Sequence, residues 1–259
     1  MRIARFTAEN ELHFGRVDGE PGEEILTVLA GDPFYTGIQP TRQTYAIDDV
    51  RLVSPIIPRS KIVGVARNWS GHAEELGNAT PSTPQLFLKP NTAVAGPGDP
   101  ITLPEASEEV SYEAELAVVI GRMAKSVPVE RVPEVVFGYT AANDLTARDL
   151  QRTDLQWARA KGFDGACPLG PWIQTELNTE ELSIRTWLDG DLVQDGTTAD
   201  MVFSVPELVA AVSEAFTLLP GDVILTGTPD GVGLVRAGQE VEIEIEGIGG
   251  PLVNTFRDA

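Results

Sequence analysis

The segment that most constrains this chain is YEAELAVVIG, residues 112–121, where two glutamates interrupt an apolar run. A short run rich in Val, Leu and Ile predicts a buried β-strand. Side chains at positions i and i+2 of a strand share a face, so Glu113 and Glu115 lie together and are followed by Ala117 and Val119. The two carboxylates therefore lead into buried surface, where like charges need protons, basic partners or a cation.

A second strand of the chain shows what an ordinary acidic face looks like. Residues 240–247, EVEIEIEG, alternate glutamates with Val241, Ile243 and Ile245. This alternation is typical of a strand with one face in water and the other in the core, and it requires no ion. The 112–121 strand has no such wet face. Its spacing leaves two interpretations open, a metal site and a pair of buried acids that share a proton.

A third carboxylate follows in GYTAANDLTARDLQ, residues 138–151. This segment predicts a short strand that ends at Asp144 and then a helix capped by Thr146. Asp144 is either a local capping residue or a partner of the glutamate pair. Three carboxylates suit a hard ion, Mg²⁺ or Mn²⁺. Zinc prefers nitrogen and sulfur ligands, and the chain has only two histidines and one cysteine.

A histidine and a glutamate form a second candidate pair. His72 and Glu75 stand three residues apart in RNWSGHAEELGN, residues 67–78, which has the pattern of a short helix. Helical spacing of three places the two side chains next to each other. A carboxylate beside an imidazole raises its basicity, which a water-activating base needs. The alternative is a surface ion pair.

Lys161 and Thr228 stand next to glycine-rich turns. Lys161 ends a predicted polar helix, residues 146–162, and is either an ordinary helix-end lysine or turns back toward the site. The turn LTGTPDGVG, residues 225–233, lacks the Gly-Lys-Ser/Thr ending of a phosphate loop. Its backbone amides and the Thr226 and Thr228 hydroxyls can still hold a carboxylate.

Length and strand pattern predict the fold class. The 259 residues are 42% hydrophobic, enough for one large domain or a main domain with a small appendage. Many short strand-like segments and few helical patterns predict a β-rich α+β fold with helices packed at its edge. The clearest helix is SVPELVAAVSEAF, residues 204–216. Prolines after residue 54 suggest a small N-terminal module, residues 1–55, and a main domain, residues 56–259.

Charge and cysteine content limit the partners and the compartment. A formal net charge of -20 opposes binding to nucleic acid and to anionic membranes, so an anionic substrate must be attracted by local cations or a metal. No stretch approaches the roughly 20 apolar residues of a membrane-spanning helix. The single Cys167 cannot form an internal disulfide. A cytoplasmic protein with a small-molecule substrate is expected.

Six segments in chain order resemble the fumarylacetoacetate hydrolase family, over roughly residues 58–256. They are ARNWSGHAEE, LFLKPNTAVAGPGDPI, SYEAELAVVIG, GYTAANDLTARDLQ, WARAKGFDGACPLGPWI and LLPGDVILTGTPDGVG. One such segment alone is a weak signal, but six in order are specific to the family. The resemblance implies a mixed β-roll catalytic domain and a homodimer. The N-terminal segment fits only the shorter bacterial members.

The resemblance also implies roles for individual residues. Glu113, Glu115 and Asp144 match the ligands of Mg²⁺ or Mn²⁺ in this family. Lys161 matches a basic side chain near the substrate, and His72 and Glu75 match a dyad on a mobile lid. Substrate contacts are expected from Arg67, Arg148, Gln151 and Thr228. One motif departs from the family, because its usual Gly-Arg-Asn-Tyr reads Ala-Arg-Asn-Trp at residues 66–69.

The implied chemistry begins with a 2-oxo acid bound to the metal, which stabilises the enolate formed when the neighbouring carbon loses a proton or a group. Three reactions share this step: C–C hydrolysis of an acylpyruvate, isomerisation of a 2-hydroxy-dienoate such as 2-hydroxyhepta-2,4-diene-1,7-dioate, and decarboxylation of a 2-oxo diacid such as oxaloacetate. The dyad of His72 and Glu75 favours hydrolysis or isomerisation, with decarboxylation as the alternative. A non-catalytic, metal-stabilised binding protein is the alternative from another class.

Overall fold

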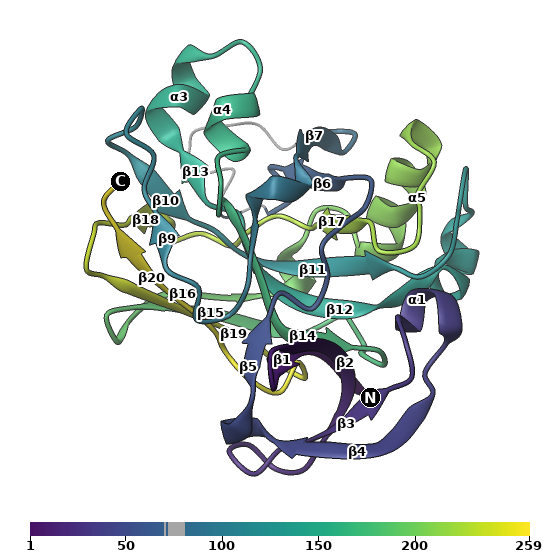
Figure 1. The fold of residues 1–259 in the computed structure, drawn as a ribbon. Coiled ribbons are helices and arrows are strands. Elements are labelled where there is room, and N and C mark those ends of the chain that lie inside the picture. Colours follow the sequence, from purple (N-terminus) through teal and green to yellow (C-terminus); the bar gives the residue numbers. More distant parts are fainter. Residues whose placement is uncertain (70, 72–80) are drawn as a thin grey trace.

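The computed structural model describes residues 1–69, 71 and 81–259, and its strands form three sheets within those ranges (Figure 1). The largest sheet begins with β1 (Arg2–Ala8), β2 (Glu11–Asp18), β3 (Ile25–Leu29), β4 (Pro40–Ala46) and β5 (Arg51–Val53), with helix α1 (Pro33–Thr36) before β4. β1 pairs antiparallel with a later strand, Ile3 opposite Ile173. The N-terminal strands thus extend the main sheet, and the domain boundary at residue 55 stays a prediction.

The middle of the largest sheet positions the candidate site. Its strands are β6 (Ile62–Ala66), β7 (Gln85–Lys89), β8 (Val94–Ala95), β11 (Ala114–Ile120), β12 (Val136–Asn143), β14 (Cys167–Gln174) and β17 (Val223–Leu225). They run in the order β14-β12-β11-β17-β6-β7, with β8 beside β14. All seven residues of β11 are buried, as expected for an apolar strand covered on both faces. β17 and β6 pair in parallel, and the other neighbours in that order pair antiparallel.

Two smaller sheets complete the β-structure. One contains β16 (Asp191–Thr197), β15 (Ser183–Leu188), β19 (Glu240–Ile245), β20 (Leu252–Arg257) and β9 (Ile101–Thr102). The other contains β13 (Thr146–Ala147), β10 (Val110–Tyr112) and β18 (Gly233–Leu234). In β19 the residues Val241, Ile243 and Ile245 are buried and Glu240 and Glu244 are exposed, which confirms the half-wet strand. Strands β15 and β19 pack against β11 and β12 of the largest sheet.

The helices lie at the edges of the sheets (Figure 1). The α-helices after the first are α3 (Arg148–Thr153), α4 (Ala158–Lys161) and α5 (Val205–Ala215), and the 3₁₀ turns are η1 (Ile47–Asp49), η2 (Asn91–Ala93), η3 (Val129–Glu134) and η4 (Thr198–Asp200). α5 confirms the helix predicted over residues 204–216, and a capping box begins it, since the Ser204 N–H donates to Glu207 Oε2 at 2.8 Å. Within the described ranges, no helix is long and apolar enough to cross a membrane. The predicted β-rich α+β fold is confirmed.

The single helix predicted over residues 146–162 is wrong. Thr146 and Ala147 pair as strand β13 with Ser111 and Val110, so the expected cap at Thr146 is inside a strand and the helix follows Ala147. The helix then ends at Thr153, since Asp154 has extended backbone angles. Strand pairing and a turn therefore divide the polar segment, and Lys161 lies in a second short helix, α4, that packs against α3.

Candidate metal and substrate site

The site forms where the predicted 112–121 strand is interrupted. β10 ends at Tyr112 and β11 begins at Ala114, which leaves Glu113 between them. The Asp144 N–H donates to the Glu113 carbonyl oxygen at 2.9 Å, and the Glu113 N–H donates to Asn143 Oδ1 at 3.0 Å. These bonds fasten the end of β12 to the break. Asp144 therefore belongs with the glutamate pair and is not a helix cap.

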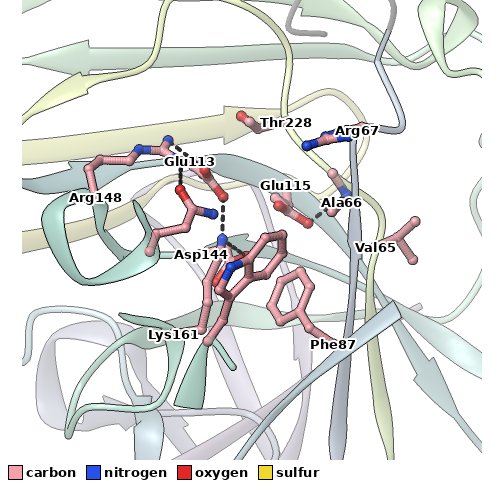
Figure 2. Close-up of a pocket in the computed structure, with 13 residues that line it drawn as sticks. Val65, Ala66, Arg67, Phe87, Glu113, Glu115, Asp144, Arg148, Lys161 and Thr228 are labelled. Atoms are coloured by element: carbon pink, nitrogen blue, oxygen red, sulfur yellow. Dashed lines mark hydrogen bonds and ion pairs between the residues drawn. The ribbon is translucent and has the colours of Figure 1, made fainter. Parts of the chain in front are cut away.

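Three carboxylates converge at this break (Figure 2). One oxygen each from Glu113, Glu115 and Asp144 lies within 4.8 Å of the other two. The side chains are buried, as the inward-facing pair predicted, with Glu115 2% and Asp144 0% exposed. The donor set consists of oxygen atoms, which is what Mg²⁺ and Mn²⁺ prefer.

Basic side chains surround two of the three carboxylates. Lys161 Nζ lies 2.8 Å from Glu113 Oε2 and 2.6 Å from Asp144 Oδ2. Arg148 Nη2 lies 2.6 Å from Glu113 Oε1, and Lys89 Nζ contacts Asp144 Oδ1. The three carboxylates and these three basic groups balance in formal charge. An ionised carboxylate offers about four lone-pair sites, so Asp144 with two basic partners can still bind an ion.

Among the described residues, Glu115 is the one of the three carboxylates that has no basic partner. Within the described residues it forms no ion pair, and its Oε2 accepts one hydrogen bond, from the Gly227 N–H at 2.6 Å. Burial, and then the charges of Asp144 and Glu113, raise the pKa of Glu115 well above its ordinary value. The side chain must therefore hold a proton or face a cation. A divalent ion among the three carboxylates fits this requirement.

Gly227 can reach Glu115 because it is a glycine. Its φ of 87° is a conformation that side-chain-bearing residues rarely adopt. A Cβ at this position would also lie 3.1 Å from Asn68 Cβ and from an atom of the Trp69 ring. The glycine-rich turn after β17 thus supplies a backbone amide to a candidate metal ligand. Sequence reasoning expected its amides near a carboxylate, but one of the substrate.

A cavity with ≈ 230 Å³ of space for water-sized molecules lies beside the carboxylates. Eight described residues that the sequence nominated for the site line it: Arg67, Glu113, Glu115, Asp144, Arg148, Gln151, Lys161 and Thr228. Thr226 does not, because its hydroxyl donates to the Leu116 carbonyl oxygen at 2.9 Å. Residues that were not nominated complete the wall: Val65, Ala66, Phe87, Trp157 and Gly227. The rings of Phe87 and Trp157 meet edge to face, with centroids 5.7 Å apart. The cavity therefore has a charged floor and an aromatic side.

Lys161 turns back into the site and is not an ordinary helix-end lysine. Its side chain is 3% exposed, and its Nζ lies 4.8 Å from the centroid of the Phe87 ring. Burial lowers its pKa, but the charges of Asp144 and Glu113 outweigh burial, so that the pKa stays above its usual value. The ammonium group is therefore charged at neutral pH. It can stabilise negative charge or donate a proton.

Two arginines offer positive charge to an anion in the cavity. Arg148 is held in place, because Nη1 donates to Gln151 Oε1 at 3.1 Å and Nε to Ser111 Oγ at 3.2 Å. Arg67 has a φ of 59°, rare for a residue with a side chain. Arg67 lines the cavity, where its guanidinium can pair with a carboxylate of a bound molecule.

Lys89 is the functional residue that sequence reasoning missed. Its side chain is fully buried, and besides Asp144 it donates to the Ala166 carbonyl oxygen at 2.7 Å. A lysine at the end of the apolar strand LFLK was the available signal, analogous to the glutamates of the 112–121 segment. Lys89 fixes the orientation of Asp144. The pair His72 and Glu75 falls outside the described residues, so its place in the site stays a prediction.

Known proteins with related sequences cover nearly the whole chain. A Mycobacterium tuberculosis protein, Rv2993c, is 44% identical over an alignment of 259 positions, which covers 96% of this chain and 96% of that one. The oxaloacetate tautomerase YisK of Bacillus subtilis is 39% identical over an alignment of 255 positions, which covers 88% of this chain and 85% of that one.

Two solved structures share the fold over all of this chain. The 5-carboxymethyl-2-hydroxymuconate delta-isomerase of Mycobacterium smegmatis is 42% identical, with a TM-score of 0.93 and full coverage of both chains. The maleylpyruvate hydrolase of Sphingobium sp. SYK-6, solved with manganese(II) and pyruvate, is 30% identical, with a TM-score of 0.81 and full coverage of both chains.

Two family descriptions match the sequence itself. Residues 1–55 match the family described as Rv2993c-like, N-terminal. Residues 61–257 match the family described as Fumarylacetoacetate (FAA) hydrolase C-terminal, a range that includes the three carboxylates and the cavity residues around them. The chain therefore belongs to the fumarylacetoacetate hydrolase family, as a short member with a small N-terminal module.

Proposed function

We propose that this protein is a divalent-metal-dependent enzyme that acts on 2-oxo acids or 2-hydroxy-dienoates, by C–C hydrolysis or isomerisation. The observation that carries the proposal is the convergence of Glu113, Glu115 and Asp144 in a buried cavity with basic side chains. Mg²⁺ or Mn²⁺ held by these carboxylates would supply Lewis-acid polarisation of the 2-oxo oxygen. Membership of an enzyme family supports catalysis over a purely structural ion.

The chain's own residues supply the remaining charge control. The Lys161 ammonium lies at the floor of the cavity, where it stabilises negative charge that develops on the substrate and can return a proton to it. Arg148, held by Gln151, lies next to Glu113 in the cavity and orients a carboxylate of the substrate. Thr228 contributes a hydroxyl at the cavity wall.

The charge balance favours a substrate with two negative charges. The three carboxylates and the basic groups of Lys89, Arg148 and Lys161 cancel in formal charge. A divalent ion, together with the Arg67 guanidinium that also lines the cavity, would leave a charge of about +3, which the dianion of a 2-oxo diacid neutralises in large part. The net charge of -20 repels anions at long range, so this local excess is what attracts the substrate.

The relatives support both the metal and the substrate class. The Sphingobium hydrolase was solved with manganese(II) and pyruvate, and pyruvate is a 2-oxo acid. The Mycobacterium smegmatis relative is described as an isomerase. Assembly as a homodimer is proposed on the family resemblance, and light scattering of the purified protein measures it.

A 2-oxo diacid activity of the oxaloacetate type is the second candidate. It is favoured by the Bacillus subtilis relative, an oxaloacetate tautomerase, and by a second oxaloacetate tautomerase, from Xenopus laevis, that is 42% identical over 213 residues. Decarboxylation and tautomerisation both change bonds at the carbon next to the 2-oxo group, where Lys161 can stabilise negative charge and a bound metal would supply Lewis-acid polarisation. They require no activated water.

A substrate screen separates these candidates. The purified protein is incubated with Mg²⁺ or Mn²⁺ and oxaloacetate, fumarylpyruvate, acetylpyruvate or the seven-carbon dienoate, and pyruvate release and dienoate or enol absorbance are recorded. We expect turnover of at least one of these acids that EDTA abolishes and Mg²⁺ restores. Binding of metal with no turnover of any of them would favour a binding protein.

The predicted dyad of His72 and Glu75 would activate the water that a hydrolytic reaction needs. We expect His72→Ala to keep metal affinity but to slow hydrolysis of an acylpyruvate by roughly 10²-fold, because the imidazole is the proposed water-activating base. Glu75→Gln should give a smaller loss, since it only orients that imidazole. Pyruvate release and calorimetric metal titration measure the two effects. Unaltered hydrolysis by His72→Ala would remove the dyad from the mechanism.

Metal and proton compete for Glu115, which predicts a pH dependence of stability. Because its folded pKa is raised above 4.5, the native metal-free protein binds a proton that the unfolded chain releases above that pH. The metal-free protein therefore loses stability as pH rises, whereas metal binding needs the ionised form and strengthens. We expect EDTA to lower the melting temperature more at pH 8 than at pH 6.

Thermal denaturation at the two pH values, with and without EDTA, checks this expectation. Glu115→Gln, which cannot ionise, provides the control and should show the same small EDTA effect at both. If EDTA leaves the wild-type melting temperature unchanged at pH 8, the three acids hold protons and basic partners without an ion.

A further inference from the structure

One buried glutamine connects the candidate site to the neighbouring sheet. Gln194 lies in β16, outside the largest sheet, and is 1% exposed. Its Oε1 accepts from the Thr186 Oγ1 hydroxyl at 2.8 Å and from the Ala114 N–H at 3.2 Å. Its Nε2 donates to Thr228 Oγ1 and to the Pro229 carbonyl oxygen, both at 2.9 Å. A single amide thus reaches both the strand break and the turn after β17.

The contacts fix which end of the amide carries the oxygen. The Ala114 N–H can only donate, so the atom that it meets must be the amide oxygen. The Pro229 carbonyl can only accept, so the atom that it meets must be the amide nitrogen. The opposite orientation would place two donors together at Ala114 and two acceptors together at Pro229. Buried in this way, such an orientation is costly.

This orientation of the Gln194 amide determines whether the Thr228 hydroxyl donates or accepts a hydrogen bond on its cavity side. Its hydroxyl oxygen accepts a hydrogen bond from Gln194, so its own proton is left to point elsewhere. Thr228 is 3% exposed and lines the cavity that holds the carboxylates (Figure 2). The hydroxyl therefore faces the cavity as a hydrogen-bond donor, and the group that it suits best is an anionic acceptor, the carboxylate of a bound acid.

We propose that Gln194 is a positioning residue that holds Thr228 as a hydrogen-bond donor to a substrate carboxylate. This inference rests on the proposed function, since it presumes an acid in the cavity. Gln194 itself does not line the cavity and touches no reacting atom. The same amide oxygen binds Ala114, which separates Glu113 from Glu115. One side chain therefore ties the substrate-binding hydroxyl to the strand break that presents the metal ligands.

Gln194→Glu tests the polarity directly, because it keeps the shape and removes the donor. At a pH high enough to ionise the introduced carboxyl, this variant would accept from Thr228, so that the hydroxyl turns a lone pair toward the cavity and opposes a substrate carboxylate. We expect KM to rise about tenfold or more, with kcat changed less than about threefold. The dissociation constant of oxalate, a dianionic mimic of a 2-oxo acid, measured by calorimetry with Mn²⁺, should rise by the same factor.

Two companion variants control for charge and for stability. Gln194→Met is neutral, removes the same donor and should also weaken oxalate binding, which keeps the test valid if the Gln194→Glu variant does not fold. Gln174→Glu is the matched control, since Gln174 donates an amide hydrogen to the Gly247 carbonyl at 3.2 Å and does not line the cavity. It should leave KM and oxalate affinity unchanged. Manganese affinity without oxalate shows whether the ligands themselves are disturbed.

A double-mutant cycle with Thr228→Val asks whether Gln194 acts through this hydroxyl. Thr228→Val should weaken oxalate as Gln194→Glu does, and the double variant should be no weaker than Thr228→Val alone. The inference would be overturned if the double variant lost oxalate affinity by the product of the two single-variant losses. Wild-type oxalate affinity in a folded Gln194→Glu variant would also overturn it. If the wild-type protein neither binds oxalate with Mn²⁺ nor turns over any acid in the screen, the proposed function fails first. The two failures are therefore distinguishable.

Discussion

The Glu115→Gln variant is expected to lose both metal binding and turnover. Glu115 is the candidate ligand without an ion-pair partner in the described part of the chain, so its charge has the largest share in holding a divalent ion. We expect Mg²⁺ affinity to fall below detection and kcat/KM to fall by roughly 10³-fold or more, as when a group that stabilises the transition-state charge is removed. Isothermal titration with Mg²⁺ and the substrate screen measure these losses.

Glutamine is chosen as the replacement for Glu115 because it is expected to preserve the fold. Its amide oxygen can still accept the Gly227 N–H, and a neutral side chain at this buried position removes repulsion with Glu113 and Asp144. Glu242→Gln, on the half-wet face of β19, is the matched control and should change neither metal affinity nor turnover. Unchanged Mg²⁺ affinity in a folded Glu115→Gln would refute the assignment.

Lys161→Met is expected to lose turnover while it keeps the metal. Methionine has nearly the length of lysine, so the cavity is filled but the ammonium group between Glu113 and Asp144 is absent. We expect kcat to fall by about 10³-fold, because positive charge at the developing negative charge is lost. Metal affinity should stay the same or increase, since a competing cation has left the carboxylates.

Single-turnover kinetics and metal titration of Lys161→Met separate these two effects. Lys125→Met serves as the control, because Lys125 donates to the Glu214 carbonyl oxygen at the surface and does not line the cavity. It should behave as the wild type. Turnover of Lys161→Met within tenfold of the wild type would show that the chemistry does not use this ammonium group.

The sequence predicted those features of the site that depend on local pattern. Two inward-facing glutamates in an apolar strand predicted burial, and Glu113 and Glu115 are buried. A carboxylate at the end of a strand left Asp144 ambiguous between a cap and a ligand. The tertiary hydrogen bond from its N–H to the Glu113 carbonyl, between residues 31 positions apart in sequence, decides this and has no local signature.

The features that sequence reasoning missed come from distant strands. Lys89 reaches Asp144 from β7, and Gln194 reaches Ala114 from a different sheet. Their partners are specified by the pairing of strands and not by neighbouring residues. The error over residues 146–162 has the same origin, since the pairing of Ala147 with Val110 replaced a helix that propensity alone favoured.

The arrangement of oxygen ligands is tested most directly by diffraction from crystals grown with Mn²⁺, with data collected at the manganese absorption edge. The proposed ligand set predicts an anomalous peak within coordination distance of oxygens from Glu113, Glu115 and Asp144. It also predicts that the peak is absent from crystals of Glu115→Gln. A wild-type map with no peak at saturating Mn²⁺, and with Lys161 still bridging Glu113 and Asp144, would contradict it.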